Sequence, residues 1–213
     1  MFPDLTRDDV FRIETKRLWL RWPRVQDAAA IARLAGEKEV AEMTANIPHP
    51  FPTGLGERFV FENRKANGTG CGLRLAIAQR EKPDRLIGFI SINDREGQAT
   101  LGYWVGKPHW GKGLATEAAH GLIDAVFSYT VIEDLHVSAH VANPASRRII
   151  EKCGFQFAGS DMQLAPARGG RVAVDRFRLP RSTWASLKGW REPRIEIDQR
   201  SLPIAEPVME ACT

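Results

Sequence analysis

A strand, a glycine-rich turn and a helix follow one another directly in residues 101–126, and this junction constrains the fold more than any other stretch. Leu101–Val105 contains aromatic and β-branched residues, which predicts a strand. Regular structure is then interrupted by Gly106, Pro108, Gly111 and Gly113. From Leu114 apolar side chains recur at helical spacing. Because the first N–H groups of a helix lack internal partners and glycine lets a ligand approach the backbone, the junction predicts a phosphate-binding turn.

The composition indicates one globular domain with a small ligand rather than a nucleic-acid partner. The 213 residues fall within the range of one large domain, and a hydrophobic content of 43% is enough for a core. The net charge of +4 suits an anionic ligand. However, the chain has neither a block of five basic residues nor an aromatic-rich basic module, so we expect no nucleic-acid binding.

The sequence predicts neither a membrane segment nor a cysteine framework. Its apolar runs are too short to span a membrane, and its N-terminus carries acidic residues where a signal peptide carries basic ones. Cys71, Cys153 and Cys212 are too widely spaced to form a local zinc site or a disulfide framework. We therefore expect a cytoplasmic protein with reduced thiols, no membrane association and no metal.

Residue patterns predict a mixed chain of the α+β or α/β type, followed by a tail. The predicted strands are 15–21, 74–78, 86–92, 101–105, 135–141, 155–158 and 172–179. The predicted helices are 28–35, 57–67, 114–126 and 143–154, and a Pro-rich loop is predicted at 45–56. Asp27 is expected to cap one helix and Gly154 to follow the end of another. The composition changes near residue 190, which predicts one domain over 1–189 and a loosely packed Pro- and charge-rich tail over 190–213.

Two kinds of phosphate ligand compete for the glycine turn, and a tight turn with no ligand is a third interpretation. Gly106–Lys112 matches the G-x-x-x-x-G-K part of a nucleotide P-loop. However, Gly113 stands where Mg²⁺ binding needs Ser or Thr, and no apolar strand ending in Asp follows at a suitable distance. These residues disfavour an NTPase and leave it as a remote alternative.

Four segments together resemble the GNAT acetyltransferases, and in particular their RimJ/RimL-like branch. The first is Trp110–Ala115, which is similar to motif A, [QR]-x-x-G-x-[GA]. The others are the opening strand Thr15–Arg21, the central strand Leu101–Val105 and the helix Asn143–Phe155. The resemblance covers about residues 12–188. It implies a GNAT fold, in which helices flank a mixed, mostly antiparallel twisted sheet that is splayed at the acetyl-CoA cleft.

The resemblance also assigns residues to the acetyl-CoA site. It implies that Tyr103, Trp104 and Val105 lie on the splayed strand whose backbone pairs with the pantetheine amides. The pyrophosphate turn would be supplied by Gly111, Lys112, Gly113, Leu114, Ala115 and Thr116. Asn143 matches the family asparagine that bonds the pantetheine arm. One of Arg147, Arg148 and Lys152 could meet the 3′-phosphate, although a solvated basic helix face is the alternative.

Two departures from the family pattern affect the expected chemistry. Trp110 stands where most members have Gln or Arg, so the phosphates lose a side-chain ligand. Ile150 stands where many members have the tyrosine that protonates the leaving thiolate. In the RimJ/RimL-like branch a serine one turn earlier is a candidate for that role, and here it is Ser146. An ordinary role for Ser146 at the helix N-terminus is the alternative.

The resemblance implies direct attack of a primary amine on the thioester, and the general base is not identified by it. The candidates are Asp94, Glu96, His136 and His140, with Tyr103 as a possible intermediary. His136 and His140 share one face of their strand, where structural histidines are the alternative. The Pro-rich loop, with His49, is expected to select the acceptor.

Several functional questions stay open on the sequence alone. The acceptor could be a protein N-terminal α-amine or a small-molecule amine. A CoA-binding sensor without turnover would keep the backbone turn while lacking an acid and a base, and the isoleucine at position 150 fits that alternative. A homodimer is implied only by the resemblance.

Overall fold

The computed structural model describes residues 2–95, 97–187 and 194–196, and its centre is one twisted sheet. The strand order is β7-β8-β6-β5-β4-β3-β2-β1-β9, and every neighbouring pair is antiparallel except β5 and β6. The strands are β1 (Arg12–Glu14), β2 (Leu18–Arg21), β3 (Gly72–Gln79), β4 (Lys82–Arg95), β5 (Gln98–Val105), β6 (Asp134–His140), β7 (Gln156–Ala165), β8 (Gly170–Pro180) and β9 (Arg194–Glu196). The predicted mixed, mostly antiparallel sheet is confirmed.

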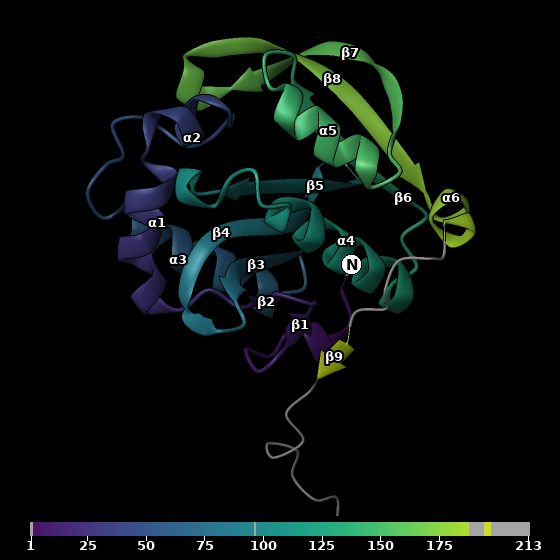
Figure 1. The fold of residues 1–213 in the computed structure, drawn as a ribbon, viewed down its shortest axis with the longest axis horizontal. Coiled ribbons are helices and arrows are strands. Elements are labelled where there is room, and N and C mark those ends of the chain that lie inside the picture. The colour runs from purple at the N-terminus through teal and green to yellow at the C-terminus, as the bar shows by residue number, and fades with distance from the viewer. Residues whose placement is uncertain (1, 96, 188–193, 197–213) are drawn as a thin grey trace, which may run out of the picture.

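Helices cover both faces of this sheet (Figure 1). They are α1 (Ala28–Ala35), α2 (Lys38–Glu42), α3 (Leu55–Gly68), α4 (Leu114–Tyr129), α5 (Pro144–Lys152) and α6 (Arg181–Ser186). The larger core lies under α4 and α5, and it includes Leu122, Phe127 and Ile150. The smaller core lies under α1 and α3, where Phe89 and Trp104 are buried. Sheet alternation therefore gives each face its own apolar layer.

Most predicted elements are present, and the differences lie where local signals are weak. The α1 bounds agree with the prediction, and Gly154 has a φ of 84°, as a residue after a helix C-terminus should. The short helices α2 and α6 were not predicted, because five or six residues give little periodicity. Asp27 occupies the predicted N-cap position of α1, but its side chain makes no capping bond to that helix.

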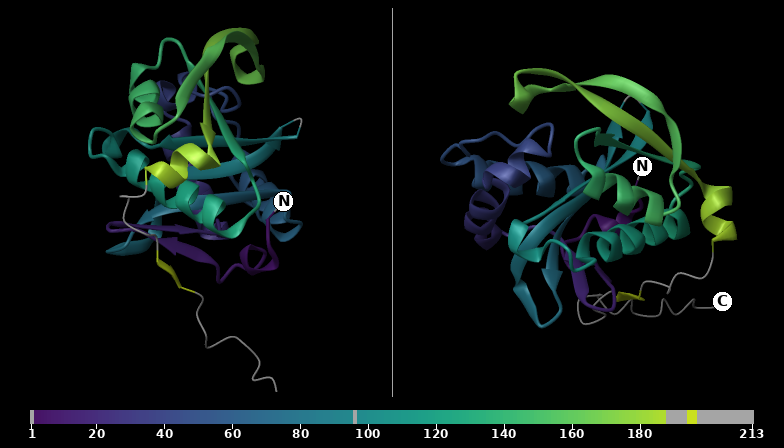
Figure 2. Two further views of the ribbon diagram at one scale, coloured as in Figure 1. Left: turned by 90° about the vertical axis from the view of Figure 1, so that its right-hand side faces the viewer. Right: turned by 45° about the horizontal axis from the view of Figure 1, so that its top comes forward.

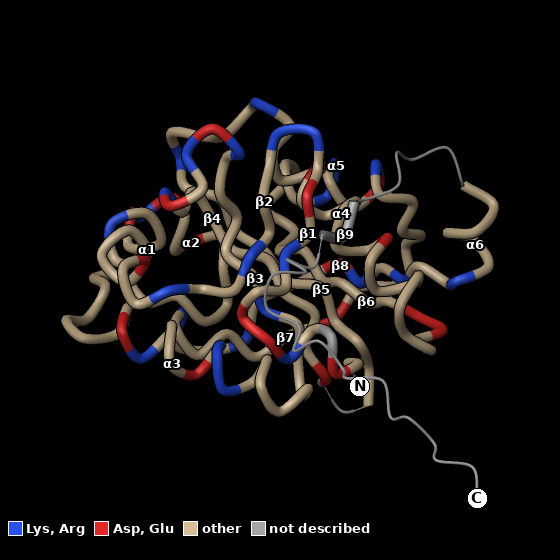
Figure 3. The backbone as a smooth tube through the Cα atoms, turned by 90° about the horizontal axis from the view of Figure 1, so that it is seen from below, with Lys and Arg blue, Asp and Glu red and all other residues tan. Residues whose placement is uncertain are grey.

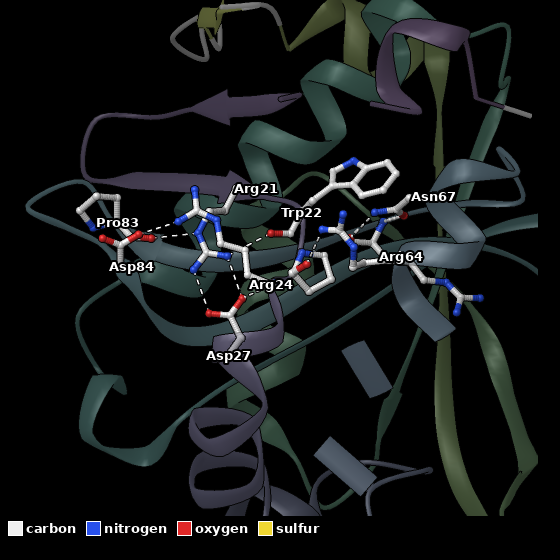
Figure 4. A network of polar contacts seen from close by, with 10 residues as sticks. Arg21, Trp22, Arg24, Asp27, Arg64, Asn67, Pro83 and Asp84 are labelled. Atoms are coloured by element: carbon white, nitrogen blue, oxygen red, sulfur yellow. Dashed lines mark hydrogen bonds and ion pairs between the residues drawn. The ribbon is translucent and has the colours of Figure 1, made fainter. Parts of the chain in front are cut away.

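Asp27 instead forms a buried ion pair with Arg21 that ties α1 to the sheet (Figure 4). The guanidinium donates from Nη1 to Oδ2 at 2.8 Å and from Nη2 to Oδ1 at 2.9 Å. The two side chains are only 4% and 1% exposed. The Arg21 Nε also donates to Pro83 O at 2.9 Å, and Arg24 N donates to Asp27 Oδ2 at 2.7 Å. The pair therefore joins β2, the residue that precedes α1 and the start of β4.

The hairpin of β7 and β8 extends beyond the rest of the sheet and arches towards α2 (Figures 1 and 2). Its tip meets the Pro-rich segment 43–54. Ala167 N donates to Ala45 O at 3.1 Å, and Arg168 Nη2 donates to Ile47 O. Two segments more than 100 residues apart in sequence are thus held side by side.

The predicted tail falls mainly outside the described residues. Its described part is β9, which pairs with β1 in the register Ile13↔Ile195. The boundary at residue 190 stays a prediction. Basic and acidic residues are interspersed along the backbone seen from below, and neither gathers in one continuous band (Figure 3). None of the helices in the described part of the chain combines the length and the apolar character that a membrane crossing requires.

Candidate active site

The sheet opens between β5 and β6, which are the only parallel neighbours among the described strands. In the described structure Thr100↔His136 is the one residue pair that joins them, so the strands diverge beyond it. β5 stays paired with β4 along its whole length, and β6 stays paired with β8 along its whole length. The opening is therefore a feature of this one strand pair, with backbone groups of β5 left free to bond a ligand.

The register of β5 decides which backbone groups face the opening. Gly88 lies opposite Val105, and Gly106 N donates to Ile87 O at 2.9 Å. That bond identifies the Gly88–Val105 pair as the non-hydrogen-bonded type, and the pairs alternate along an antiparallel ladder. The N–H and C=O groups of Tyr103 and Val105 thus face β6, whereas those of Trp104 face β4. The backbone of Trp104 is not available to a ligand in the opening, which differs from the prediction.

The glycine turn follows β5 directly and leaves six consecutive backbone donors free. Gly111 and Gly113 both have a φ of 72°, and α4 begins at Leu114 without a side-chain cap. Within the described residues, no hydrogen-bond acceptor is present for the N–H groups of residues 111–116. Residues 111–113 are exposed to solvent. Unpaired N–H groups at a helix N-terminus form a site for an anion such as a phosphate.

Two side chains keep the turn in this shape without covering its donors. The indole Nε1 of Trp110 donates to Val105 O at 2.6 Å, which fastens the turn to the end of β5. Lys112 Nζ donates to Pro108 O at 2.9 Å, so its charge stays beside the turn. Trp110 therefore supports the loop, and its indole N–H is not offered to the phosphate site.

The N-terminus of α5 closes the other side of the opening. Asn143 Oδ1 accepts from Ser146 N at 3.0 Å and caps the helix. In the part of the chain that the structure describes, the Asn143 Nδ2 group donates to no acceptor, which leaves it free for a ligand. The Ser146 hydroxyl lies 2.9 Å from the Tyr103 hydroxyl, and Ile150, one turn on, is buried in the core.

Tyr103 and Ser146 thus form a hydroxyl pair that links β5 to α5. Burial raises the pKa of Tyr103 far above its usual range, against a smaller opposite effect of the Ser146 hydrogen bond. The phenol therefore stays protonated at any working pH. When it donates to Ser146 Oγ, the serine proton is free to be donated to a third group.

Cys153 lies in the core near this pair and is not a reactive thiol. It is fully buried, and burial raises its pKa to about 12, with Asp124 adding to the rise. A thiol with that pKa is protonated at neutral pH, so it cannot act as a nucleophile. The structure therefore gives no support to an acetyl-cysteine intermediate at this position.

The structure separates the candidate general bases. His140 Nδ1 accepts from Ala142 N at 3.1 Å, so its neutral ring has no free lone pair. Asp94 Oδ1 accepts from Gly97 N at 2.8 Å in the exposed turn between β4 and β5. Glu96 lies outside the described residues. Of the four candidates, His136 alone combines a described position beside the opening with ring nitrogens that bond no described residue.

His136 lies at the point where β5 and β6 begin to diverge. It is half-buried on the sheet face opposite to Leu135 and Val137, which pack under the helices. Burial lowers its pKa below the usual 6.5, Asp134 opposes this shift, and Arg178 adds to it. Arg178 and Asp134 are bonded to each other at 2.8 and 2.9 Å. The imidazole is therefore neutral at pH 7.

The Pro-rich segment 43–54 lies between α2 and α3 and is anchored at several points. His49 Nδ1 donates to Gly36 O at 2.9 Å, and the side chain is exposed. The hairpin tip holds Ala45 and Ile47, as described above. His49 thus has a structural partner, and a role for it at the acceptor site stays a prediction.

The basic face of α5 is partly engaged. Arg147 donates to Glu151 at 2.8 Å and to Asp175 at 2.9 Å, so its charge is neutralised. Arg148 and Lys152 are exposed. Either remains available to the 3′-phosphate, which stays a prediction.

Sequence reasoning missed two charged residues beside the turn. Arg17 Nη1 donates to Lys112 O at 3.0 Å, and Arg17 Nε donates to Glu117 Oε2 at 2.6 Å. Both residues occur in segments that the sequence singles out, but 100 residues separate them and no local signal pairs them.

Comparisons with known proteins identify the family to which the chain is similar. The family model described as Acetyltransferase (GNAT) domain matches residues 17–156. The chain is 24% identical over 172 residues to the uncharacterized N-acetyltransferase p20 of Bacillus licheniformis, covering 80% of this chain and 97% of that protein.

Two solved structures share the fold at low sequence identity. The microcin C7 self-immunity acetyltransferase MccE, in complex with acetyl-CoA and AMP, matches with a TM-score of 0.67 and 21% identity over 78% of this chain and 93% of that one. RimL, a ribosomal L7/L12 α-N-protein acetyltransferase in complex with coenzyme A, matches with a TM-score of 0.68 and 18% identity over 79% and 97%. At these identities the likeness concerns the fold.

Proposed function

The chain belongs to the GNAT acetyltransferase family, and from that premise we propose that it transfers the acetyl group of acetyl-CoA to a primary amine in one direct step. The observation that carries the proposal is the run of six free N–H groups at residues 111–116, next to the opening between β5 and β6. A pyrophosphate fits the first feature and an extended amide-bearing arm fits the second. The alternative phosphate ligand, a nucleoside triphosphate with Mg²⁺, has no extended amide-bearing arm that would pair with the free backbone groups of β5.

The cofactor contacts that we propose follow from this placement. Residues 111–116 would bind the pyrophosphate through their N–H groups. Tyr103, through its N–H and C=O, and Val105, through its N–H, would pair with the pantetheine amides, together with Asn143 Nδ2. Val105 O is engaged by Trp110, and Trp104 leaves the set because its backbone faces β4.

The position that we propose for the thioester carbonyl of acetyl-CoA follows from the direction of the pantetheine arm. The phosphates lie beyond the C-terminal end of β5, so an arm lying along β5 runs back towards Thr100 and His136. Its thioester end then lies between two sets of side chains. Tyr103 and Ser146 are on the face covered by α5, and His136 is on the opposite face.

We propose that these two sets divide the proton transfers. His136 takes a proton from the attacking amine as the C–N bond forms. As the C–S bond breaks, Ser146 donates a proton to the thiolate and is resupplied through the Tyr103 hydroxyl at 2.9 Å. The hydroxyl pair regains this proton from water, and His136 releases its proton to water, before the next turnover. N–H groups of β5 that face the opening can stabilise the carbonyl oxygen in the transition state.

The acceptor would enter from the side that carries His136. We define the acceptor side as α1, α2, the segment 43–54 and the hairpin tip 166–169. The acceptor is a primary amine, and either a polypeptide N-terminus or a small-molecule amine would suit the chemistry. We infer that the segment 43–54 selects between them, because it is the longest irregular segment of this side.

Calorimetry with acetyl-CoA and a thiol-release assay over a panel of amines test this function together. The panel should pair N-terminal peptides with polyamines and amino acids at equal concentrations. We expect acetyl-CoA binding and thiol release with one of these two classes. Binding without release for any amine would instead support a CoA-binding sensor, and absence of acetyl-CoA binding would contradict the whole assignment.

A further inference from the structure

The side chain of Arg17 reaches the phosphate turn from the segment that leads into β2. Its Nη1 donates to Lys112 O at 3.0 Å, which is a backbone carbonyl within the turn. Its Nε donates to Glu117 Oε2 and its backbone N to Glu117 Oε1, both at 2.6 Å. Arg17 therefore contacts both the turn and the first helical turn of α4.

Glu117 holds Arg17 in a fixed position. Its side chain is 16% exposed, and Thr15 Oγ1 also donates to Oε1 at 2.6 Å. Burial alone would raise the pKa of Glu117, but the hydrogen bonds from Thr15 and Arg17 outweigh burial and lower it. A carboxylate with three donors stays ionised at neutral pH and fixes the guanidinium in one orientation.

One end of the Arg17 guanidinium remains unused beside the open glycine. A Cβ built on Gly113 would lie 3.6 Å from Arg17 Nη2. Within the described residues Nη2 has no acceptor, and the side chain as a whole is 46% exposed. Gly113 N–H is one of the six free donors, so a phosphate bound there would lie within reach of Nη2.

We propose that Arg17 is a side-chain ligand for a phosphate of the acetyl donor, positioned by its ion pair with Glu117. The inference rests on the proposed function and deepens it. The planar guanidinium suits a phosphate, and the helix dipole of α4 adds positive potential at the same place. Arg17 would thus supply the side-chain contact that Trp110 cannot, since its indole is bonded to Val105 O.

Three acetyl donors distinguish this role from a merely structural one. They are acetyl-CoA, acetyl-dephospho-CoA, which lacks the 3′-phosphate, and S-acetylpantetheine, which lacks all phosphates. We expect Arg17→Ala to weaken acetyl-CoA affinity about 10-fold to 100-fold, as for a charged hydrogen bond, and to leave kcat/KM with S-acetylpantetheine within about 2-fold. Glu117→Gln should weaken acetyl-CoA affinity by a smaller factor, and it should likewise leave kcat/KM with S-acetylpantetheine unchanged.

Lys16→Ala is the matched control, because Lys16 is the exposed neighbour with the same charge and no bond to a described residue. Lys16→Ala should leave the affinity and kcat/KM for all three donors unchanged. If the Arg17→Ala loss persists with acetyl-dephospho-CoA, the ligand is the pyrophosphate. If the loss disappears with that donor, the ligand is the 3′-phosphate, and both results support the proposal.

An equal loss with all three donors would overturn the proposal, because it would show that Arg17 only shapes the turn. If Arg17→Ala unfolds, Arg17→Lys replaces it, since it retains the charge but loses the planar fork. It should give an intermediate loss that is again confined to donors with phosphates. Wild-type protein that binds no acetyl-CoA would reject the proposed function, whereas equal binding by wild type and Arg17→Ala would reject this inference alone.

Discussion

The donor side and the acceptor side of the opened sheet are built in different ways. On the donor side, the proposed phosphate contacts come from the backbone of one continuous segment, residues 111–116. On the acceptor side, α2, the segment 43–54 and the hairpin tip 166–169 are joined only in the folded chain, by bonds such as Ala167 N to Ala45 O. A backbone site depends on where glycines stand in the sequence, whereas an assembled surface depends on packing. The two sides should therefore respond differently to substitution.

The largest effect that we predict concerns the anchor of the acceptor side. Asp27→Asn leaves the Arg21 guanidinium buried without its counter-charge, so we expect a loss of about 3–5 kcal/mol in the free energy of unfolding. Chemical denaturation measures this loss, and hydrogen exchange should show faster opening of α1 than of α4.

Asp84→Asn is the control for this prediction, because it breaks the exposed Arg24–Asp84 pair in the same network. We expect it to cost less than about 1 kcal/mol. Equal losses for the two variants would show that burial of the Arg21–Asp27 pair is not what anchors α1.

The second prediction tests whether the donor side is a backbone site. Gly113→Val places a branched side chain where the phosphate would approach, and it should weaken acetyl-CoA affinity about 100-fold, as for the loss of two charged hydrogen bonds. Calorimetry measures the affinity. Gly97→Val is matched in backbone strain, since Gly97 has a φ of 79° in open space in the turn before β5, at the end of that strand away from the phosphate turn. It should leave the affinity unchanged. Unaltered binding by Gly113→Val would contradict the placement of the phosphates.

The difference between the two sides also explains what the sequence could predict. The turn was predictable because Gly106, Gly111 and Gly113 carry the information in their own positions, and the strand and helix around them have clear periodicity. The opening of the sheet came from the family resemblance, because no local pattern encodes which strands diverge.

The remaining parts of the site could not be predicted from local patterns. Arg17 and Glu117 pair across 100 residues, and the hairpin tip meets Ala45 across more than 100. Asp27 was predicted as a helix cap because capping is a local signal, but its partner Arg21 is supplied by a neighbouring strand. Hydrogen-bonded and non-hydrogen-bonded pairs alternate along β4 and β5, and this alternation turns the backbone of Trp104 away from the opening. It follows from the register of β4 against β5, which no local sequence pattern encodes.

The third prediction concerns the base on the acceptor side. His136→Gln should lower kcat/KM about 100-fold at pH 7, at the lower end of general base catalysis. The pKa of His136 is lowered below 6.5, so the wild-type imidazole accepts a proton at pH 7 and loses this ability as the pH falls through its own pKa. Protonation of the acceptor amine adds its own tenfold loss per pH unit. The acid limb of log kcat/KM should therefore approach a slope of 2 in wild type and 1 in His136→Gln.

His140→Gln provides the comparison on the same strand and face, and we expect its activity to stay within about 2-fold of wild type, because the Nδ1 of His140 is already engaged by Ala142 N. A slope of 1 in the wild type would remove His136 from the mechanism. A pH profile is the appropriate readout, since a purely structural role for the imidazole would lower the rate without altering the slope.

The smallest effect is predicted for the hydroxyl on the donor side. Ser146→Ala should lower kcat about 10-fold while acetyl-CoA affinity stays within about 2-fold, because the backbone donors and Asn143 remain and only the proton donor to the thiolate is lost. Tyr103→Phe should have a similar effect, and the double variant should be no worse than either single one, since the two hydroxyls act as one relay. Ser160→Ala removes a hydroxyl bonded to Asp175 on β8 and serves as the control. Steady-state kinetics with the acceptor found in the amine panel measure all four variants. An unchanged kcat for Ser146→Ala would mean that the thiolate takes its proton from water, and the donor side would then contribute backbone groups alone.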